Sequence, residues 1–577
     1  MTNPLSRRRT SRRTFLTVAG AGAAAAAVGG SGLLAGCDSS GGNKGPGTTS
    51  KDDINKIIPN YIQNTSVKAD IPSVTGTAGA VSDPVFLSYP ASPVQTVPST
   101  PGSGGSYTTM TPLWGAIPPA SGNAYYDAVN QALGTTLKIQ ASDGNNYGNT
   151  LPPLFAADKL PDWIQIPGWN TTNLNFGSAV AKFVDLTPYL SGDKISAYPN
   201  LANIPSGAWS AAVWNGKLYG LPVYPSNATF AGAVFFRRDI FDKQGINPDS
   251  IKTAEDLKAL GAQLTSKTAG QYAFGDVFGD VGNYAAQLFG FHMKWDQDAT
   301  GKLVHSYETE GIVAALEWHA SLAKAGYIHP ADIARTDQNA KQRFWSGKTV
   351  IAADGTGAWN GQDAKSGTAA NAGYVRQAFK LLSASAGQTP SIELQPGASM
   401  FAYLNAKLTE AQVKELLAVA NYLAAPYGSK EWLVVNFGAE GQTYTMKDGN
   451  PVLSDSGSKL VATTFQFLVT APAVTTVQEG FTQVAKDYAA WQADTVKYAR
   501  TPIFFGMNIT EPAQYSSIGQ AVQDTISDVK VGRKPISAFT DAVAARRKNG
   551  GDELRKFYDE IRSKYVTGAS SAPTPSS

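Results

Sequence analysis

Cysteine and histidine are scarce in this sequence of 577 residues, which contains one cysteine and four histidines. A single thiol cannot form an internal disulfide, so the fold must depend on burial of an apolar core, for which the chain is long enough. The histidines form neither an HExxH pattern nor an i,i+4 pair and lie far apart, at His292, His305, His319 and His329. Because zinc sites need clustered ligands, we expect no zinc site and no cofactor.

One segment resembles the first half of a calcium-binding loop. Asp296, Asp298 and Gly301 match its first, third and sixth positions, but Tyr307 stands where the twelfth position needs glutamate. We interpret this segment as a hairpin turn. A calcium ion near Asp296 stays an open alternative.

A GxxxxGK[ST] phosphate-binding loop is also missing, which argues against nucleotide hydrolysis by such a loop. The chain carries 48 basic and 45 acidic residues, but residues 1–36 hold five arginines, no lysine and no acidic residue. The remainder therefore has 43 basic residues against 45 acidic ones. This balance gives no basic surface for a nucleic-acid partner.

The first 37 residues resemble an export signal followed by a lipidation site. Arg12 and Arg13 stand before Phe-Leu as in twin-arginine signals, and an uncharged run rich in Ala and Gly covers residues 18–35. Leu-Ala-Gly-Cys, ending at Cys37, is similar to the lipobox, whose cysteine is acylated. The Ala/Gly run buries too little apolar area for a retained membrane span. We expect export by the twin-arginine route and a lipid anchor at Cys37, on the outer face of the cytoplasmic membrane.

Strand-like and helix-like patterns alternate from residue 107 onward. Residues 107–114, 136–140 and 163–166 have the pattern of strands, and residues 123–133 and 151–157 have that of helices. This order predicts parallel βαβ units with helices on both faces of the sheet. A body of this length exceeds one core, so we expect two α/β lobes. Longer helices are predicted over residues 253–264, 310–325, 410–424, 476–499 and 536–549.

Five segments, in this order, resemble one protein family. They are WNGKLYGLP (214–222), FRRDIFDKQGI (236–246), FWSGKTV (344–350), NFGAEG and the residues after it (436–451), and GRKPISAF with a following helical segment (532–554). Together they resemble extracellular solute-binding proteins of carbohydrate ABC importers, of the family 1 class and its long lipoprotein branch. The resemblance implies an α/β, two-lobed periplasmic-binding-protein-like fold, each lobe a βαβ sheet flanked by helices, with hinge crossovers between the lobes.

Composition and resemblance together predict how the chain is divided. We expect a twin-arginine lipoprotein signal peptide (1–36), a lipid-anchored flexible tether and extended arm (37–106), the first part of the N-lobe (107–225), the C-lobe (226–395), a return to the N-lobe with C-terminal helices (396–569), and a disordered tail (570–577).

The function implied by the resemblance is capture of a sugar or oligosaccharide in an inter-lobe cleft and its delivery to the permease subunits of an ABC importer. We expect a monomer that is not an enzyme. Aromatic residues make up 10% of the chain, and sugars stack their C–H faces on aromatic rings while Asn, Asp and Glu pair with their hydroxyls. The candidate ligand-binding residues are Trp169, Trp359, Tyr224, Asn227, Asp143, Asn146, Tyr147, Asp354, Glu440, Tyr444 and Trp114. For each tryptophan, packing in the core is the alternative.

An extracytoplasmic carbohydrate-active hydrolase is the alternative function. A glycosidase needs two carboxylates across the scissile bond, and the sequence shows no recognisable catalytic motif that holds such a pair. Ser-x-x-Lys patterns begin at Ser191, Ser456 and Ser527. Three matches to so short a pattern carry little information, and Ser191 is better explained as part of a turn.

Overall fold

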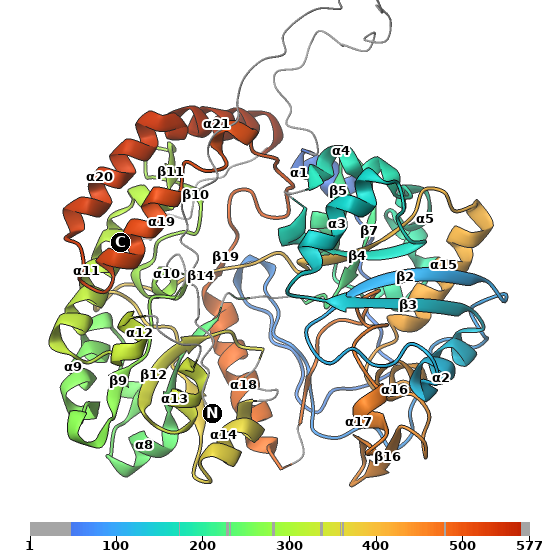
Figure 1. Cartoon of the computed structure of the whole chain (residues 1–577), viewed down its shortest axis with the longest axis horizontal. Coiled ribbons are helices and arrows are strands. Elements are labelled where there is room, and N and C mark those ends of the chain that lie inside the picture. The colour runs from blue at the N-terminus through green and yellow to red at the C-terminus, as the bar shows by residue number, and fades with distance from the viewer. Residues whose placement is uncertain are drawn as a thin grey trace, which may run out of the picture. The chain divides into compact units, whose positions relative to one another are not determined.

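The computed structural model describes residues 48–171, 174–226, 230, 232–279, 283–334, 339–357, 359, 363–477 and 480–566 (Figure 1). The expected export signal with Arg12 and Arg13, the anchor Cys37, the crossover residue Asn227 and the expected tail lie outside these residues. Residues 1–44 and 45–577 form separate units, and all described residues belong to the second unit. Within the described part of the chain, no helix has the length and apolar character that crossing a membrane would require.

The first sheet has five strands in the order β3-β2-β4-β15-β7 (Figure 1). Strands β2, β3 and β4 are parallel, and β15 runs antiparallel to both β4 and β7. The strands are β2 (Ser106–Leu113), β3 (Thr136–Asp143), β4 (Trp163–Pro167), β7 (Gly220–Val223) and β15 (Met400–Leu404). Helices α2 (Ala124–Leu133) and α3 (Tyr147–Ala156) connect the parallel strands. The predicted strand–helix alternation is therefore confirmed.

Local sequence explains these elements. The Asn123 side chain caps α2 by accepting the N–H groups of Tyr125 and Tyr126, and Gly134 ends the helix with φ of 63°. The Trp163, Ile164 and Ile166 side chains of β4 are completely buried. A strand covered on both faces needs such a continuous apolar run.

The second sheet has four strands in the order β13-β8-β12-β9. Strand β12 is parallel to β9 and antiparallel to β8. The strands are β8 (Ala233–Arg237), β9 (Tyr272–Phe274), β12 (Thr349–Asp354) and β13 (Arg376–Ala378). The chain thus leaves the first sheet after β7, builds the second sheet, and returns to the first sheet in β15 (Figure 1).

The predicted long helices are all present, and the largest difference is in α18, which is ten residues shorter than predicted. They are α9 (Ala254–Leu264), α11 (Glu310–Ala325), α15 (Glu410–Leu423), α18 (Thr482–Thr495) and α20 (Ile536–Arg546). Helix α18 begins later than predicted because residues 475 and 476 form β18 (Thr475–Thr476), which pairs with β1 (Val85–Phe86). Helix α20 passes at Arg547 into a π-helical turn (Arg547–Gly551), within which Gly550 adopts φ of 115°.

The other α-helices and strands of the described chain are as follows. The helices are α1 (Lys51–Ile57), α4 (Phe176–Ala179), α5 (Thr187–Leu190), α6 (Pro199–Ala202), α7 (Ser206–Trp209), α8 (Arg238–Lys243), α10 (Asn283–Phe289), α12 (Pro330–Ala334), α13 (Ala340–Trp345), α14 (Ala364–Ala370), α16 (Lys430–Phe437), α17 (Gly457–Leu460), α19 (Gln520–Val529) and α21 (Asp552–Tyr565). The strands form hairpins or short pairs: β5 (Val213–Trp214) with β6 (Lys217–Leu218), β10 (Trp295–Gln297) with β11 (Leu303–His305), β14 (Ile392–Glu393) with β19 (Ala499–Arg500), and β16 (Tyr444–Lys447) with β17 (Asn450–Leu453).

The N-terminal arm links the segments that cross between the sheets. The Asp83 N–H donates to Gln492 Oε1 of α18 (2.9 Å), and Gln492 Nε2 donates to Asp83 Oδ2 (2.9 Å). Ser226 Oγ, in the segment between β7 and β8, donates to Asp83 Oδ1 (3.4 Å). The Ser226 N–H in turn donates to the carbonyl of Gly397, shortly before β15 (2.8 Å). Asp83 therefore ties the arm, α18 and both crossing segments together.

Burial raises the pKa of Asp83 to about 6, and hydrogen bonds from Gln492 and Ser226 oppose the rise. A carboxyl whose folded pKa exceeds its unfolded value contributes stability below the unfolded pKa and loses it as pH rises through about 6. We therefore compare the free energy of unfolding of Asp83→Asn with that of the wild type at each pH. This difference should favour the variant more above pH 6 than at pH 4, by up to about 3 kcal/mol. Thermal unfolding of both proteins from pH 4 to pH 7.5 measures this difference.

The matched control is Asp127→Asn, which changes an exposed carboxyl on α2. Because this side chain is exposed, the control should shift the unfolding midpoint by no more than a few degrees. A difference between wild type and Asp83→Asn that stays constant across the range would contradict the assignment of a buried, ionising Asp83.

Candidate functional site

Three of the predicted aromatic residues follow strands of the first sheet whose carboxyl ends share one edge. Trp114 follows β2, Trp169 lies just after β4 and Tyr224 follows β7. Strand β7 is parallel to β4, because both run antiparallel to β15. The side chains of Trp114, Trp169 and Tyr224 are 45%, 57% and 40% exposed. Ligands of open α/β sheets bind outside this edge, so exposed rings here form a candidate binding surface.

Phe467 joins these residues into one cluster. Its ring centroid lies 5.5 Å from that of Trp114 and 5.6 Å from that of Tyr224, and Trp114 lies 6.1 Å from Trp169. We call Trp114, Trp169, Tyr224 and Phe467 the aromatic shelf. Phe467 is itself only 6% exposed, so it is the buried ring on which Trp114 and Tyr224 pack. Sequence reasoning missed Phe467, because it lies outside helices and strands and far along the chain from the other three.

The backbone of Tyr224 adopts an unusual conformation that orients its ring. Its φ of 51° is left-handed, a conformation that costs a non-glycine residue about 1–3 kcal/mol. The Tyr224 N–H donates to Thr470 Oγ1 (2.7 Å), and its hydroxyl donates to Gln466 Oε1 (3.0 Å). Gln466 Nε2 donates to Asn436 Oδ1 (2.8 Å), which brings the NFGAEG segment into the support of the shelf.

The polar loop after β3 borders the shelf. A Cβ on Gly144 would lie 2.5 Å from the Trp114 ring, so the indole lies directly on this loop. Asp143 and Asn146 are both exposed, and Asn146 Nδ2 donates to Asp143 Oδ2 (2.6 Å). Both side chains therefore offer hydrogen-bonding groups beside the aromatic rings.

Three of the predicted ligand-binding residues have buried side chains in the structure. Trp359 is 1% exposed, with its ring centroid 5.3 Å from that of Phe235 in the core of the second sheet. Tyr147 is completely buried at the start of α3 and donates its hydroxyl to the carbonyl of Gln165 (2.8 Å). Tyr444 is 4% exposed and packs on Phe437.

The remaining candidates lie elsewhere. Glu440 is exposed in the turn from α16 to β16, beside Tyr444. Asp354 ends β12 in the second sheet and accepts the N–H of Gly355 (2.8 Å). It lines a pocket of about 180 Å³ at the carboxyl ends of β9 and β12. The shelf and this pocket therefore occupy equivalent edges of the two sheets.

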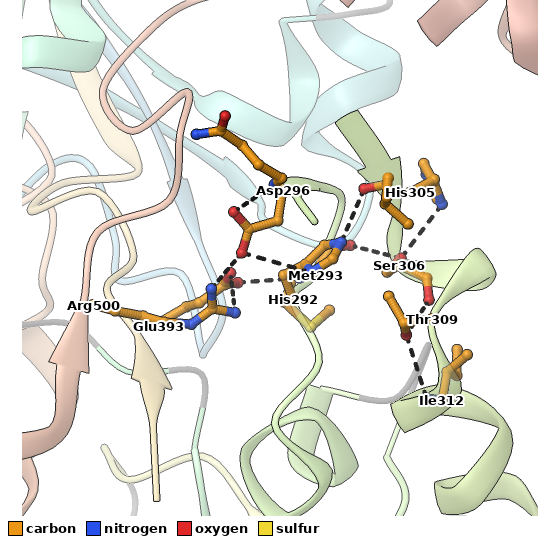
Figure 2. A network of polar contacts seen from close by, with 11 residues as sticks. His292, Met293, Asp296, His305, Ser306, Thr309, Ile312, Glu393 and Arg500 are labelled. Carbon is orange, nitrogen blue, oxygen red and sulfur yellow. Dashed lines mark hydrogen bonds and ion pairs between the residues drawn. The ribbon is translucent and has the colours of Figure 1, made fainter. Parts of the chain in front are cut away.

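The calcium-like segment is a hairpin turn, as interpreted from the sequence. Asp298 Oδ1 accepts the N–H groups of Thr300 (2.9 Å) and Lys302 (3.0 Å) between β10 and β11. Asp296 instead forms an ion pair with Arg500, which also pairs with Glu393 (2.9 Å), as Figure 2 shows. Among the described residues, no three His, Cys, Asp or Glu side chains are grouped as a metal site.

The Ser-x-x-Lys patterns also have structural explanations. Ser191 precedes Gly192, whose φ of 58° marks a turn. Ser456 Oγ donates to the carbonyl of Gln442 (3.0 Å). Lys530 lies buried, with its Nζ 2.6 Å from Asp276 Oδ2. The turn interpretation of Ser191 is confirmed.

Comparisons with known proteins agree with this architecture. The model of the family described as bacterial extracellular solute-binding protein matches residues 124–450. An uncharacterised ABC transporter extracellular-binding protein of Pyrococcus horikoshii is 27% identical over 138 residues, which cover 24% of this chain and 29% of that protein. The arabinooligosaccharide-binding protein of Bacillus subtilis is 27% identical over 169 residues, covering 29% of this chain and 35% of that protein. The chain thus matches only about a third of the length of these curated relatives.

Solved structures extend the comparison to most of the described chain. The HMO binding, ABC-transporter associated solute-binding protein from Bifidobacterium longum infantis has a TM-score of 0.61 at 13% identity. The alignment covers 81% of this chain and 100% of that one. At this identity the likeness concerns the fold, and it confirms the expected two-lobed α/β architecture.

Proposed function

The chain belongs to the bacterial extracellular solute-binding proteins, and from this premise we propose that it captures an oligosaccharide on the aromatic shelf and delivers it to the permease of an ABC importer. The observation that carries the proposal is the set of three exposed aromatic side chains at one edge of the first sheet. Singly exposed aromatic residues are common, but exposed apolar side chains gathered into one patch mark sites of interaction. The B. subtilis relative, by its name, binds arabinooligosaccharides.

The chemistry of the shelf suits a sugar. Indole and phenol rings offer flat apolar faces for the C–H groups of a pyranose or furanose ring. Asp143, Asn146 and the Tyr224 hydroxyl supply donors and acceptors at the edge of these faces. A ligand longer than one ring would contact both Trp114 and Trp169, whose centroids are 6.1 Å apart.

We further propose that the protein acts outside the cytoplasmic membrane, held there by a lipid on Cys37 after twin-arginine export. The sequence pattern around Arg12, Arg13 and Cys37 supports this anchor, and a receptor without a transport path of its own benefits from staying near its permease. Incorporation of a labelled fatty acid into the wild type and not into Cys37→Ser tests the anchor. The hydrolase alternative is not proposed, since the matched family consists of binding proteins.

A panel of saccharides tests the main proposal. We expect at least one neutral oligosaccharide to raise the thermal unfolding midpoint of the protein, because a ligand at a hundred times its Kd stabilises the folded state by about 2.7 kcal/mol. No cleavage product should form in the same mixtures. Repeated turnover of a glycan would contradict the proposal, and so would the absence of any saccharide-dependent shift.

A further inference from the structure

Part of the N-terminal arm forms a loop whose two ends pair with each other. The Ile71 N–H donates to the carbonyl of Val85 (3.2 Å), and the Val85 N–H donates to that of Ile71 (3.0 Å). A second bridge, between Thr75 and Val81, lies further along the loop. We call residues 71–85 the clasp. Because its ends are joined, the clasp attaches to its surroundings as one piece.

The clasp packs into the second lobe, by which we mean the second sheet and the helices around it. Ala80 is completely buried and lies in one apolar cluster with Phe235 of β8 and Trp491 of α18. Helix α18 belongs to this lobe, because Trp491 Nε1 donates to the carbonyl of Phe379 just after β13 (3.1 Å). The clasp therefore contributes to the core of the second lobe.

The tip of the clasp lies directly against the segment that follows α18. A Cβ on Gly76 would stand 2.1 Å from the carbonyl oxygen of Val496, so any side chain here would force the two segments apart. Thr77 Oγ1 donates to the carbonyl of Ala499 (2.7 Å). The next residue, Ala78, adopts a left-handed φ of 53°, a conformation that persists only where the surrounding structure enforces it. The tip is therefore held by close contact with the second lobe.

The chain before and after the clasp packs on the first lobe, which is formed by the first sheet and its helices. Ile54 is buried in the core of that lobe. Phe86, which directly follows the clasp, has its ring centroid 4.7 Å from that of Tyr427, between α15 and α16. Val67, which precedes the clasp, packs against the same cluster as Phe86. The arm therefore runs from the first lobe to the second and returns to the first.

The return crossing takes place between two adjacent residues. Val85 packs against Ala485 and Ala489 of α18, whereas Phe86 packs on the first lobe. Successive residues of a strand point to opposite faces, and their Cα atoms are about 3.8 Å apart. No spare length of chain therefore lies between the two contacts. Strand β1 also pairs with β18, on the segment that leads into α18, so these two crossing strands lie side by side.

Two lobes with separate cores move relative to each other unless a large apolar interface joins them. The core cluster of the first sheet is separate from the two clusters of the second sheet. The main chain crosses between the lobes before β8, before β15 and through β18, and the arm adds two crossings to these. Each added crossing reduces the freedom with which the lobes rotate and separate.

We propose that the clasp restrains the two lobes, so that it fixes the pivot about which they move and limits their separation in the ligand-free protein. This device goes beyond the proposed function, since it concerns the lobes and no ligand class. Near the base of the clasp, the hydrogen bonds of Asp83 with Gln492 and Ser226 join it to α18 and to the segment between β7 and β8. Restraint before binding reduces the conformational entropy that the protein loses when a ligand fixes the lobes.

Distances between two spin labels, one on each lobe, measure this restraint in the absence of a ligand. Lys459→Cys on α17 and Lys365→Cys on α14 place the labels at exposed positions, in a full-length chain whose only cysteine is removed by Cys37→Ser. Gly76→Ala adds the Cβ that meets Val496, and the φ of Gly76 is an ordinary −111°, so the change acts through this contact. We expect it to widen the distance distribution by about 2 Å or more, the scale of domain rearrangements.

The matched control is Gly519→Ala, at a glycine with φ of −85° where a Cβ would meet no atom within 4 Å. This control should leave the distance distribution unchanged. Thr77→Val removes only the hydroxyl donor and should widen the distribution to a smaller extent, so it is the deciding variant if Gly76→Ala does not fold. Folded Gly76 and Thr77 variants that keep the wild-type distribution would overturn the restraint and leave the proposed capture of an oligosaccharide unaffected.

Discussion

Trp169→Ala is expected to raise the Kd for the best-binding neutral oligosaccharide by about 5- to 30-fold. The Trp169 side chain is 57% exposed in the ligand-free protein, and covering this exposed part with a sugar removes apolar area worth about 1–2 kcal/mol. Trp114→Ala should have an effect of similar size. The two rings contact each other. We therefore expect the double variant to lose less binding free energy than the sum of the losses in the two single variants. Isothermal titration of the three variants measures these changes.

The matched control for the shelf is Tyr61→Ala. Tyr61 is also an exposed aromatic, 44% accessible, but it lies on the N-terminal arm. This variant should bind the same oligosaccharide with unchanged affinity. About half of each side chain is exposed, so their removal should lower the thermal midpoint by only a few degrees. Unaltered affinity in both Trp114→Ala and Trp169→Ala, with intact folding, would remove the shelf from the binding site.

Arg237→Met is expected to destabilise the folded protein by about 3–5 kcal/mol. Arg237 is completely buried. Its Nε and Nη2 donate to the two carboxylate oxygens of Asp239, and both hydrogen bonds are 2.8 Å long. Its Nη1 donates to the carbonyls of Phe344 (2.7 Å) and Trp345 (2.8 Å) at the end of α13. Methionine fills a similar volume but leaves the Asp239 charge and two carbonyls without these donors. The thermal midpoint should fall by at least about 5 °C.

Arg238→Met is the matched control, since it changes the adjacent residue of the same FRRD segment. Arg238 is exposed and pairs with Asp242 one helical turn later (2.6 Å). Exposed pairs of this kind contribute about 0–1 kcal/mol, so the control should shift the midpoint by no more than a degree or two. Arg237→Lys should recover only part of the loss, because an ammonium cannot reproduce the planar fork of a guanidinium. Equal stabilities of the Arg237→Met and Arg238→Met variants would refute this assignment.

Local patterns in the sequence were sufficient to predict most of the secondary structure and the fold class. The alternation of apolar runs and helical spacing over residues 107–166 produced the βαβ order of the first sheet, because strand and helix periods depend on near neighbours. The hairpin after Asp296 followed from its turn residues in the same way. Helix α18 was predicted too long, since pairing of β18 with the distant β1 shortened it.

Site residues were predicted less completely, because exposure depends on neighbours far along the chain. Trp169 and Trp359 both follow a strand in a Gly-containing loop, and nothing local separates them. The fold covers Trp359 with residues of β8 and α18 and leaves Trp169 open. Phe467 and Gln466 contact Tyr224 although they lie about 240 residues further along the chain. A contact over such a sequence separation cannot be predicted from the spacing of residues.

By itself, the sequence was enough to predict a two-lobed α/β protein of the solute-binding family, and its aromatic content pointed to a sugar as the ligand. The tertiary structure alone decided which aromatic rings remain open and which carboxylates share one pocket. The physical reason is that periodicity and turn chemistry act over a few residues, whereas burial and charge balance are set by long-range packing. The shelf joins residues 114 to 467, and the pocket beside Asp354 joins residues 235 to 376, so both could be recognised only in the folded chain.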